Sequence, residues 1–240
     1  MKLKKILTNT LLVLLFAVGL VLVFNNQIKN FFIQQTSDTY TISRVSKKEI
    51  KENQKKPASF DFGQVNSISS EAVAKAKAKN TKVPTVAGIA VPDVGINLSI
   101  FRGLDNDSLL FGAGTMKEDQ QLGQGNYALA GHKTENPELL FTPLERSTIG
   151  QLVYITDLEN IYTYSITKNE IVDPTAVEVI EDVPDKTLLT LVLCGDMAAT
   201  TRRIVQAEYV NKVPMNTASE EQLQAFQLEK RHFSVKNHGL

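Results

Sequence analysis

The sequence predicts a mainly β domain, an antiparallel barrel or sandwich, preceded by a single apolar helix at the N-terminus. Two patterns support this prediction. After residue 83 the chain divides into short apolar or alternating runs that are separated by turn residues, which is typical of β-strands. Before residue 25 it holds one apolar stretch that is long enough to cross a hydrocarbon layer.

The apolar stretch covers residues 6–24 and follows Lys2, Lys4 and Lys5. About twenty helical residues span a hydrocarbon layer of about 30 Å. Because positive residues favour the cytoplasmic side, we expect a single-pass cell-membrane protein with a cytoplasmic N-terminus and an extracellular domain. A cleaved signal peptide is the alternative, but residues 25–29 lack the small-residue pattern of a cleavage site.

Changes in composition predict five segments. They are a cytoplasmic tail (1–5), a transmembrane anchor (6–26), a polar stalk with a short helix (27–82), the folded β domain (83–215) and a partly helical C-terminal tail (216–240). The stalk helix is expected from Ser70 to Lys79. In the tail, Ser219 with Gln222 three residues later indicates a capping box at a helix start.

Seven strands are expected in the folded domain, over residues 86–91, 96–101, 126–132, 151–156, 161–171, 188–194 and 203–210. Tyr162, Tyr164 and Ile166 alternate with polar residues, as in a half-buried strand. Residues 188–193 are almost continuously apolar, which predicts a strand covered on both faces. Two short helices are expected over 107–111 and 139–145.

The charge balance argues against a nucleic-acid-binding protein. Lys+Arg and Asp+Glu are both 26, so the formal net charge is zero. The chain has no Trp and only 7% aromatic residues, which leaves little surface for stacking on bases. We therefore expect no nucleic-acid partner.

One cysteine, one histidine and an arginine are candidates for a reactive site. Cys194 is the only cysteine, so it cannot form an internal disulfide, and it ends a predicted buried strand. His132 is the only histidine in the predicted domain, and Arg202 and Arg203 open the strand after the cysteine. Thiol acyl transfer needs a nucleophile, a proton carrier and a donor to the oxyanion, and these residues supply all three. Each taken alone also has an ordinary structural interpretation: a buried thiol, a satisfied histidine, a solvated arginine.

Several motifs make the chain similar to the class A sortases of Gram-positive bacteria, and to the streptococcal type in particular. Residues 190–194 read T-L-V-L-C with Arg202 eight residues later, which resembles the family signature T-L-x-T-C followed by arginine. Residues 129–132 read L-A-G-H and match the family's histidine motif L-A-[GS]-H. Other similar stretches lie at 89–98, 112–117, 123–127 and 141–144.

The resemblance implies an eight-stranded sortase-type β-barrel with short helices. It also implies a cysteine transpeptidase that cleaves an LPxTG-like sorting signal between Thr and Gly through a thioacyl-enzyme. Cys194 would attack the threonine carbonyl and His132 would carry the proton. Arg202 would donate to the oxyanion or hold the substrate backbone. The partners would be LPxTG-bearing surface proteins and an amine of lipid II or peptidoglycan, and no cofactor is expected.

The resemblance also implies a substrate-binding loop, over residues 171–184, which would pack around the Leu-Pro part of the signal. The predicted substrate-binding residues are Val172, Pro174, Val177 and Leu193. Leu193 stands where the family usually has threonine, so a hydroxyl contact to the substrate would be missing and the rate or the signal preference would differ.

Two further residues concern the neighbourhood of the proposed site. Lys133 follows His132 where related sequences often have a second histidine, and it adds a positive charge near the base. Because adjacent strand residues point to opposite faces, only one of Arg202 and Arg203 can reach Cys194, and the eight-residue spacing favours Arg202.

Some class A sortases bind calcium, and the candidate carboxylates are Asp105, Asp107, Glu118, Asp119 and Glu170. A hard cation needs several converging oxygens, and nothing in the sequence shows convergence, so we predict no required metal.

Three other functions stay open. A pilin-polymerising sortase would use a lysine acceptor and tend to carry a lid segment ahead of the barrel or a second membrane span, and neither is evident in the sequence. A cysteine peptidase of another fold would release product at the same rate with or without an amine. A membrane-tethered binding module would have an unreactive Cys194.

Overall fold

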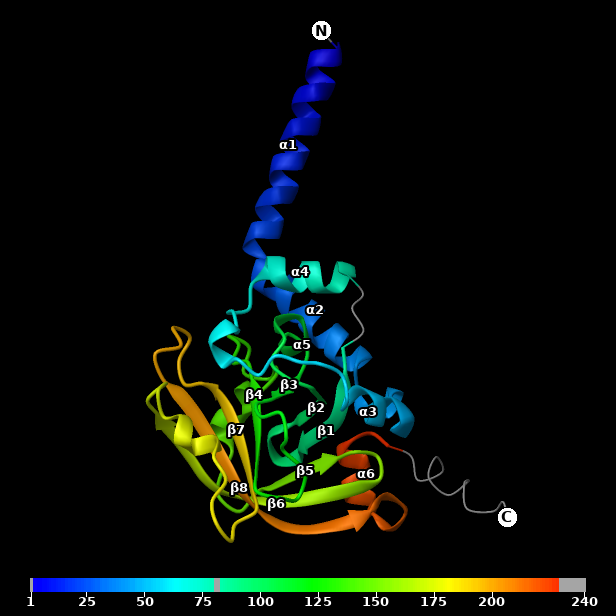
Figure 1. Cartoon of the computed structure of the whole chain (residues 1–240). Coiled ribbons are helices and arrows are strands. Elements are labelled where there is room, and N and C mark those ends of the chain that lie inside the picture. The colour runs from blue at the N-terminus through cyan, green and yellow to red at the C-terminus, as the bar shows by residue number, and fades with distance from the viewer. Residues whose placement is uncertain (1, 80–82, 229–240) are drawn as a thin grey trace, which may run out of the picture.

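A computed structural model of the chain describes residues 2–79 and 83–228, and in this part eight strands close into a barrel (Figure 1). The order around the barrel is β1-β2-β3-β4-β7-β8-β6-β5. The strands are β1 (Thr85–Val91), β2 (Ile96–Phe101), β3 (Ala113–Thr115), β4 (Asn126–Gly131), β5 (Leu152–Thr156), β6 (Asn160–Val172), β7 (Leu188–Cys194) and β8 (Arg202–Pro214). The predicted mainly β fold is therefore a barrel rather than a sandwich.

Most neighbouring strands run antiparallel, but β2 pairs with β3 and β4 pairs with β7 in parallel. The seven predicted strands are all present, and β2 and β7 have the predicted bounds. The sequence did not predict β3, because its three residues are too few for an alternating pattern and include Gly114. Tertiary pairing with β2 and β4 makes it a strand.

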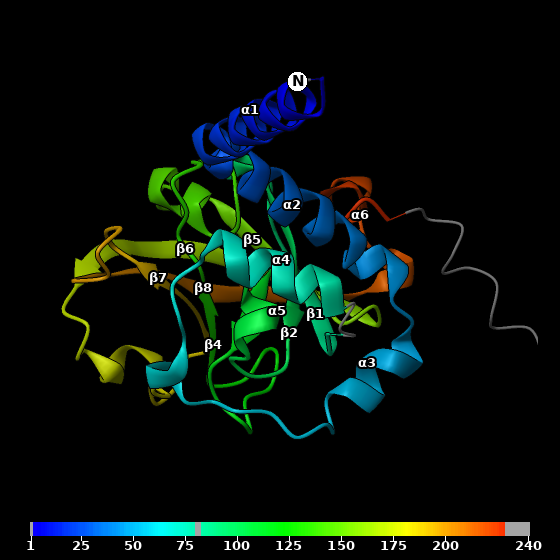
Figure 2. The same cartoon turned by 90° about the horizontal axis from the view of Figure 1, so that it is seen from above.

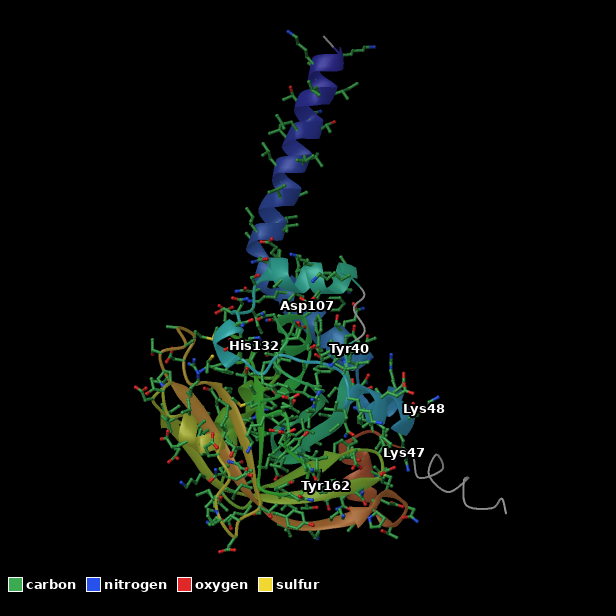
Figure 3. The ribbon with its side chains drawn as sticks, in the orientation of Figure 1. Tyr40, Lys47, Lys48, Asp107, His132 and Tyr162 are labelled. Carbon is green, nitrogen blue, oxygen red and sulfur yellow. The ribbon has the colours of Figure 1, made fainter. Side chains whose placement is uncertain are left out.

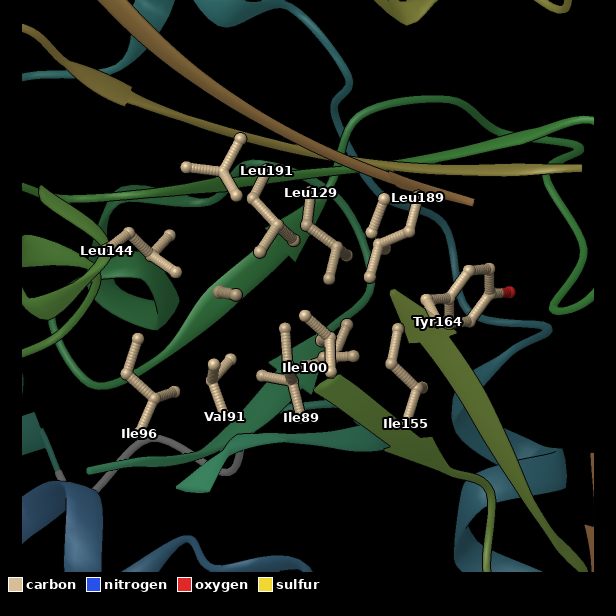
Figure 4. Close-up of a cluster of buried hydrophobic side chains, with 14 of the residues drawn as sticks. Ile89, Val91, Ile96, Ile100, Leu129, Leu144, Ile155, Tyr164, Leu189 and Leu191 are labelled. Atoms are coloured by element: carbon tan, nitrogen blue, oxygen red, sulfur yellow. The ribbon is translucent and has the colours of Figure 1, made fainter. Parts of the chain in front are cut away.

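The barrel core consists of aliphatic and aromatic side chains from alternate strand positions (Figure 4). In β7, Leu189, Leu191 and Leu193 belong to this core. The residues between them, Thr190 and Val192, are buried on the other face, so β7 is covered on both faces as predicted. This strand places its last residue, Cys194, at the edge of the buried region.

Helix α1 (Lys2–Val23) projects away from the barrel (Figure 1). Residues 4–23 form the one helix, within the part of the chain that the structure describes, that is long and apolar enough to cross a membrane. Its side chains make almost no contact with the rest of the protein, which leaves this apolar surface available to lipid.

Three helices between α1 and the barrel pack against the barrel (Figure 2). They are α2 (Asn25–Thr39), α3 (Lys47–Asn53) and α4 (Ser70–Lys79). Ile33 of α2 and Val73 of α4 are buried together with Phe101 of β2. The segment that was expected to form a polar stalk therefore contacts the barrel, because single apolar residues within it find partners there.

A second contact of this segment lies beside β1. Ile42 is fully buried, and a Cβ at Gly88 of β1 would lie only 2.8 Å from the Cβ of Ile42. Glycine at position 88 thus allows the segment to approach the strand closely. A capping box between Ser46 and Glu49 begins α3, whose Ile50 is also buried.

The remaining helices are short. Helix α5 (Asn106–Leu109) lies where a helix was predicted over 107–111. The helix predicted over 139–145 is a 3₁₀-helix, η4 (Thr142–Arg146), with a proline in its first turn. Helix α6 (Glu220–Ala225) begins with the predicted Ser219 capping box, and residues 229–240 of the predicted tail lie outside the described residues.

Candidate active site

Three neighbouring strands place a row of residues at one end of the barrel. Cys194, the last residue of β7, pairs with Arg202, the first residue of β8. On the other side of β8, Arg202 pairs with Val172, the last residue of β6. Because residues paired across a sheet share a face, the thiol, the guanidinium and the valine side chain lie on the same side of the barrel wall.

His132, the residue directly after β4, extends this row to a fourth strand. Strand β4 runs parallel to β7 with Ala130 beside Val192, so His132 follows at the level of Cys194. Ala130 packs in a small cluster outside the barrel core, with Leu104 and Leu109. The alternation of side chains therefore brings His132 to the outer face, where Cys194 lies.

A cavity of about 390 Å³ joins these side chains. Cys194, His132 and Arg202 all line it, together with parts of the loops that follow β4 and β7. Figure 3 shows His132 at the end of the barrel that lies near the helices before β1. The structure thus brings the three predicted catalytic residues to one cavity.

His132 is buried, with 8% of its surface exposed. Burial lowers the pKa of His132 to about 4, so the ring is uncharged at neutral pH. Its Nε2 atom has no hydrogen-bond partner among the described residues. An uncharged imidazole with a free ring nitrogen can accept a proton from a nearby thiol.

Arg202 is held by the loop that precedes it. Its Nη1 donates hydrogen bonds to the carbonyl oxygens of Ala199 at 2.8 Å and Thr201 at 3.0 Å. Its Nε is buried and has no hydrogen-bond partner in the described part of the chain. The guanidinium is thus fixed by one nitrogen and keeps another donor for negative charge that develops in the cavity.

The loop after Cys194 is closed by its own hydrogen bonds. Asp196 accepts from the hydroxyls of Thr200 and Thr201, both at 2.7 Å, and from the Thr200 amide at 3.1 Å. These bonds, the one from the Thr200 hydroxyl first, hold the pKa of Asp196 well below its usual range. A Cβ at Gly195 would lie 2.3 Å from the Thr201 hydroxyl, so this turn requires glycine.

Arg203 lies away from the cavity. It pairs with Leu193, whose side chain is in the barrel core, and its Nη1 donates to the Asn169 side chain at 2.7 Å. Arg203 is not among the residues that line the cavity. The structure therefore places Arg202, and not Arg203, beside Cys194.

The predicted substrate-binding residues do not line the cavity. Leu193 is 1% exposed and points into the barrel core, because it alternates with Cys194, so it cannot supply the predicted substrate contact while the barrel is folded. Val172 ends the row beside Arg202. Pro174 and Val177 lie in the loop after β6, where Val177 is 69% exposed.

The sequence did not predict that residues before the barrel line the cavity. Phe62, Val65 and Ile68 do so, and the ring of Phe62 lies 5.4 Å from the guanidinium carbon of Arg202. We call residues 62–68 the covering segment. A segment ahead of the barrel thus borders the site, although none was evident in the sequence; aromatic residues inside a polar stretch were the available signal.

The candidate calcium ligands do not form a cluster. Within residues 2–79 and 83–228, no three His, Cys, Asp or Glu side chains are grouped so that they could hold a metal ion. Asp107 is paired with Lys79 at 2.8 Å, and Glu118 with Arg102 at 3.6 Å.

Comparisons with known proteins agree on one family. A model of the sortase domain matches residues 89–210. Sortase A of Streptococcus agalactiae is 51% identical over 221 residues, which cover 90% of each chain. Sortase A of Listeria monocytogenes is 36% identical over 230 residues, which cover 96% of this chain and all of that protein.

Solved structures show the same barrel. The structure of Listeria monocytogenes sortase A superposes with a TM-score of 0.56 at 35% identity, covering 61% of this chain and 99% of that one. Sortase C-3 of Streptococcus pneumoniae reaches a TM-score of 0.57 at 18% identity, covering 81% of this chain and 96% of that one, and shares the fold.

Proposed function

Because the chain belongs to the sortase family, we propose that Cys194, His132 and Arg202 carry out its reaction. The protein is a sortase A-type cysteine transpeptidase, which cleaves an LPxTG-like sorting signal between Thr and Gly and transfers the protein to a cell-wall amine. The observation that supports the three roles is that these side chains, from three adjacent strands, line one cavity.

In the first step, Cys194 attacks the threonine carbonyl carbon of the signal. The thiol proton passes to His132, whose low pKa keeps the free ring uncharged and able to accept it. The carbonyl oxygen becomes an oxyanion, and the unpaired Nε of Arg202 donates a hydrogen bond to it.

In the second step, the carbon–nitrogen bond to glycine breaks. The His132 imidazolium returns its proton to the leaving amine, and the threonine carbonyl stays on sulfur as a thioester. An acceptor amine then attacks the thioester and loses a proton to His132. The carbon–sulfur bond breaks, and the sulfur regains that proton.

Val172, Pro174 and Val177 would contact the Leu-Pro part of the signal. Val172 pairs with Arg202 across the strands, so an extended peptide whose threonine carbonyl reaches Arg202 could continue along the loop after β6. The exposed side chain of Val177 offers apolar surface on this loop.

The proposed location follows from α1. A single pass with the three lysines in the cytoplasm would hold the barrel at the outer surface of the membrane. Surface proteins with an LPxTG signal and the amine of lipid II or peptidoglycan would meet the enzyme there.

The test uses the full chain in detergent, an LPxTG peptide and triglycine. Mass spectrometry should detect a thioacyl adduct on Cys194, cleavage between Thr and Gly, and a triglycine-transfer product. The Cys194→Ala variant should lose at least about 10³-fold in turnover. Unchanged turnover in this variant would refute the assignment, and cleavage at one rate with and without triglycine would indicate a plain peptidase.

A further inference from the structure

A charged cluster lies beside the site, and one of its members, Lys133, lines the same cavity as Cys194. Its members are Lys133, which follows His132, Arg203, which follows Arg202, and Glu145 of η4. The Lys133 ammonium lies 2.7 Å from the Glu145 carboxylate, and the Nε of Arg203 lies 3.8 Å from it. One carboxylate thus joins the two cations that stand next to His132 and Arg202 in the sequence.

Lys133 also forms a hydrogen bond with the residue that follows the nucleophile. Its ammonium donates to the carbonyl oxygen of Gly195 at 3.0 Å, and Gly195 directly follows Cys194. An ammonium has three hydrogens, so both bonds form together. The Lys133 side chain is 15% exposed, which limits its freedom to leave these partners.

The segment that holds Glu145 is itself tied to the barrel. The Asn169 amide of β6 donates to the carbonyls of Leu144 at 3.1 Å and Ser147 at 2.9 Å. The Phe141 amide, just before η4, donates to the carbonyl of His132 at 3.2 Å. The backbone on both sides of Glu145 is therefore tied to the barrel, and its carboxylate, 34% exposed, reaches Lys133 from this fixed segment.

We propose that Lys133 is a positioning residue for the transpeptidation reaction. It holds the Cys194 loop against the end of β4 and thereby sets the position of the thiol relative to the His132 ring. Catalytic groups must be held within about 0.5 Å of the productive geometry, and a displacement of about 1 Å can reduce the rate 100-fold. Glu145 also offsets the positive charge of Lys133, which would otherwise oppose the imidazolium formed in the reaction. This inference rests on the proposed roles of Cys194 and His132.

The experiment compares four variants of the full chain: Lys133→Met, Lys133→Arg, Glu145→Gln and Lys186→Met. Lys186 is the matched control, because it forms a lysine–glutamate pair with Glu208 at 3.0 Å beside the start of β7, away from Cys194 at its end. For each variant we would measure kcat and KM for peptide transfer to triglycine, the pH profile of kcat/KM and the melting temperature. Saturating alkylation gives the fraction of reactive Cys194.

Lys133→Met should reduce kcat by about 10- to 100-fold with KM changed by less than about threefold, and should shift a limb of the pH profile by about half a unit. Lys133→Arg should restore most of the rate, and Lys186→Met should stay within about twofold of the unmodified enzyme. If Lys133→Met does not fold, Glu145→Gln tests the proposal instead, because it keeps the shape of the side chain while it removes the charge. It should also lower kcat.

The proposal is overturned if the folded variants keep kcat and the pH profile, or if the lost rate only matches a lost fraction of reactive Cys194. Cys194→Ala separates the two hypotheses. If it stays active, the proposed function fails. If it is inactive while Lys133→Met and Glu145→Gln behave like the unmodified enzyme, only the role of Lys133 fails.

Discussion

Strand β7, which carries Cys194, and the loop that contains the covering segment are held in place by different interactions. Six of the seven residues of β7 are buried, and backbone pairing joins the strand to β4 and β8. Residues 54–69 are all described by the structure, and none of them is fully buried. Phe62 and Val65 pack on the small cluster at Ala130, and the Asn66 amide donates to the side chain of Asn106.

Because of this difference, one part of the chain fixes the position of the nucleophile and another part controls access to it. A segment with few buried contacts opens locally at low free energy, whereas a central strand is released only when the domain unfolds. Cys194 therefore keeps its position even when the covering segment opens over the cavity.

Removing a core side chain of the barrel wall should have the largest effect. Leu129 of β4 is fully buried in the barrel core, three residues before His132. Leu129→Ala should lower the free energy of unfolding by about 3 kcal/mol because of lost burial and the cavity left behind, as measured by urea denaturation. Ile149→Ala, at an exposed isoleucine, should change it by less than about 0.5 kcal/mol. If both substitutions lowered the free energy of unfolding equally, packing in the barrel core would not be what stabilises the barrel wall.

Acid should destabilise the fold through His132. The folded-state pKa is about 4, below the ordinary value of 6.5, so the unfolded chain binds the proton first as pH falls. The contribution of His132 to stability is complete above about pH 6.5 and decreases towards pH 4, by up to about 3 kcal/mol.

Urea denaturation between pH 7 and pH 4 measures this loss. His132→Asn should flatten the pH dependence in that window. If the cover stayed open and water reached the ring, the pKa would return towards 6.5. The variant and the unmodified chain would then show the same slope, which would contradict the buried site.

Loosening the covering segment should have the smallest effect, a moderate rise in the rate at which Cys194 is alkylated. The contact of Phe62 with Arg202 is worth about 0.5–1 kcal/mol, so Phe62→Ala should speed alkylation of Cys194 by iodoacetamide about two- to fivefold. Phe60 is the matched control, because it makes a similar contact with Arg102 at 5.3 Å but does not line the cavity. Equal acceleration by Phe60→Ala would mean general loosening rather than a local cover.

The parts that could be predicted from the sequence depend on residue type and local pattern. The apolar runs indicated β2 and β7 with their observed bounds, and the Ser219 capping box indicated the start of α6. Strand β3 could not be predicted, because pairing rather than composition makes it a strand. The contacts of Ile33 and Ile42 with the barrel were missed because isolated apolar residues in a polar stretch carry no periodic signal.

By itself the sequence determined which groups could react, because a single cysteine and a single histidine in the domain leave no other choice of thiol and imidazole. How these groups are arranged depends on the fold as a whole. Strand register and the closure of the barrel decide which of two adjacent side chains faces the cavity, as for Arg202 and Arg203. They also bring Lys133, Glu145 and Gly195 together from distant parts of the chain. Such contacts depend on the closed sheet as a whole, so no local pattern encodes them.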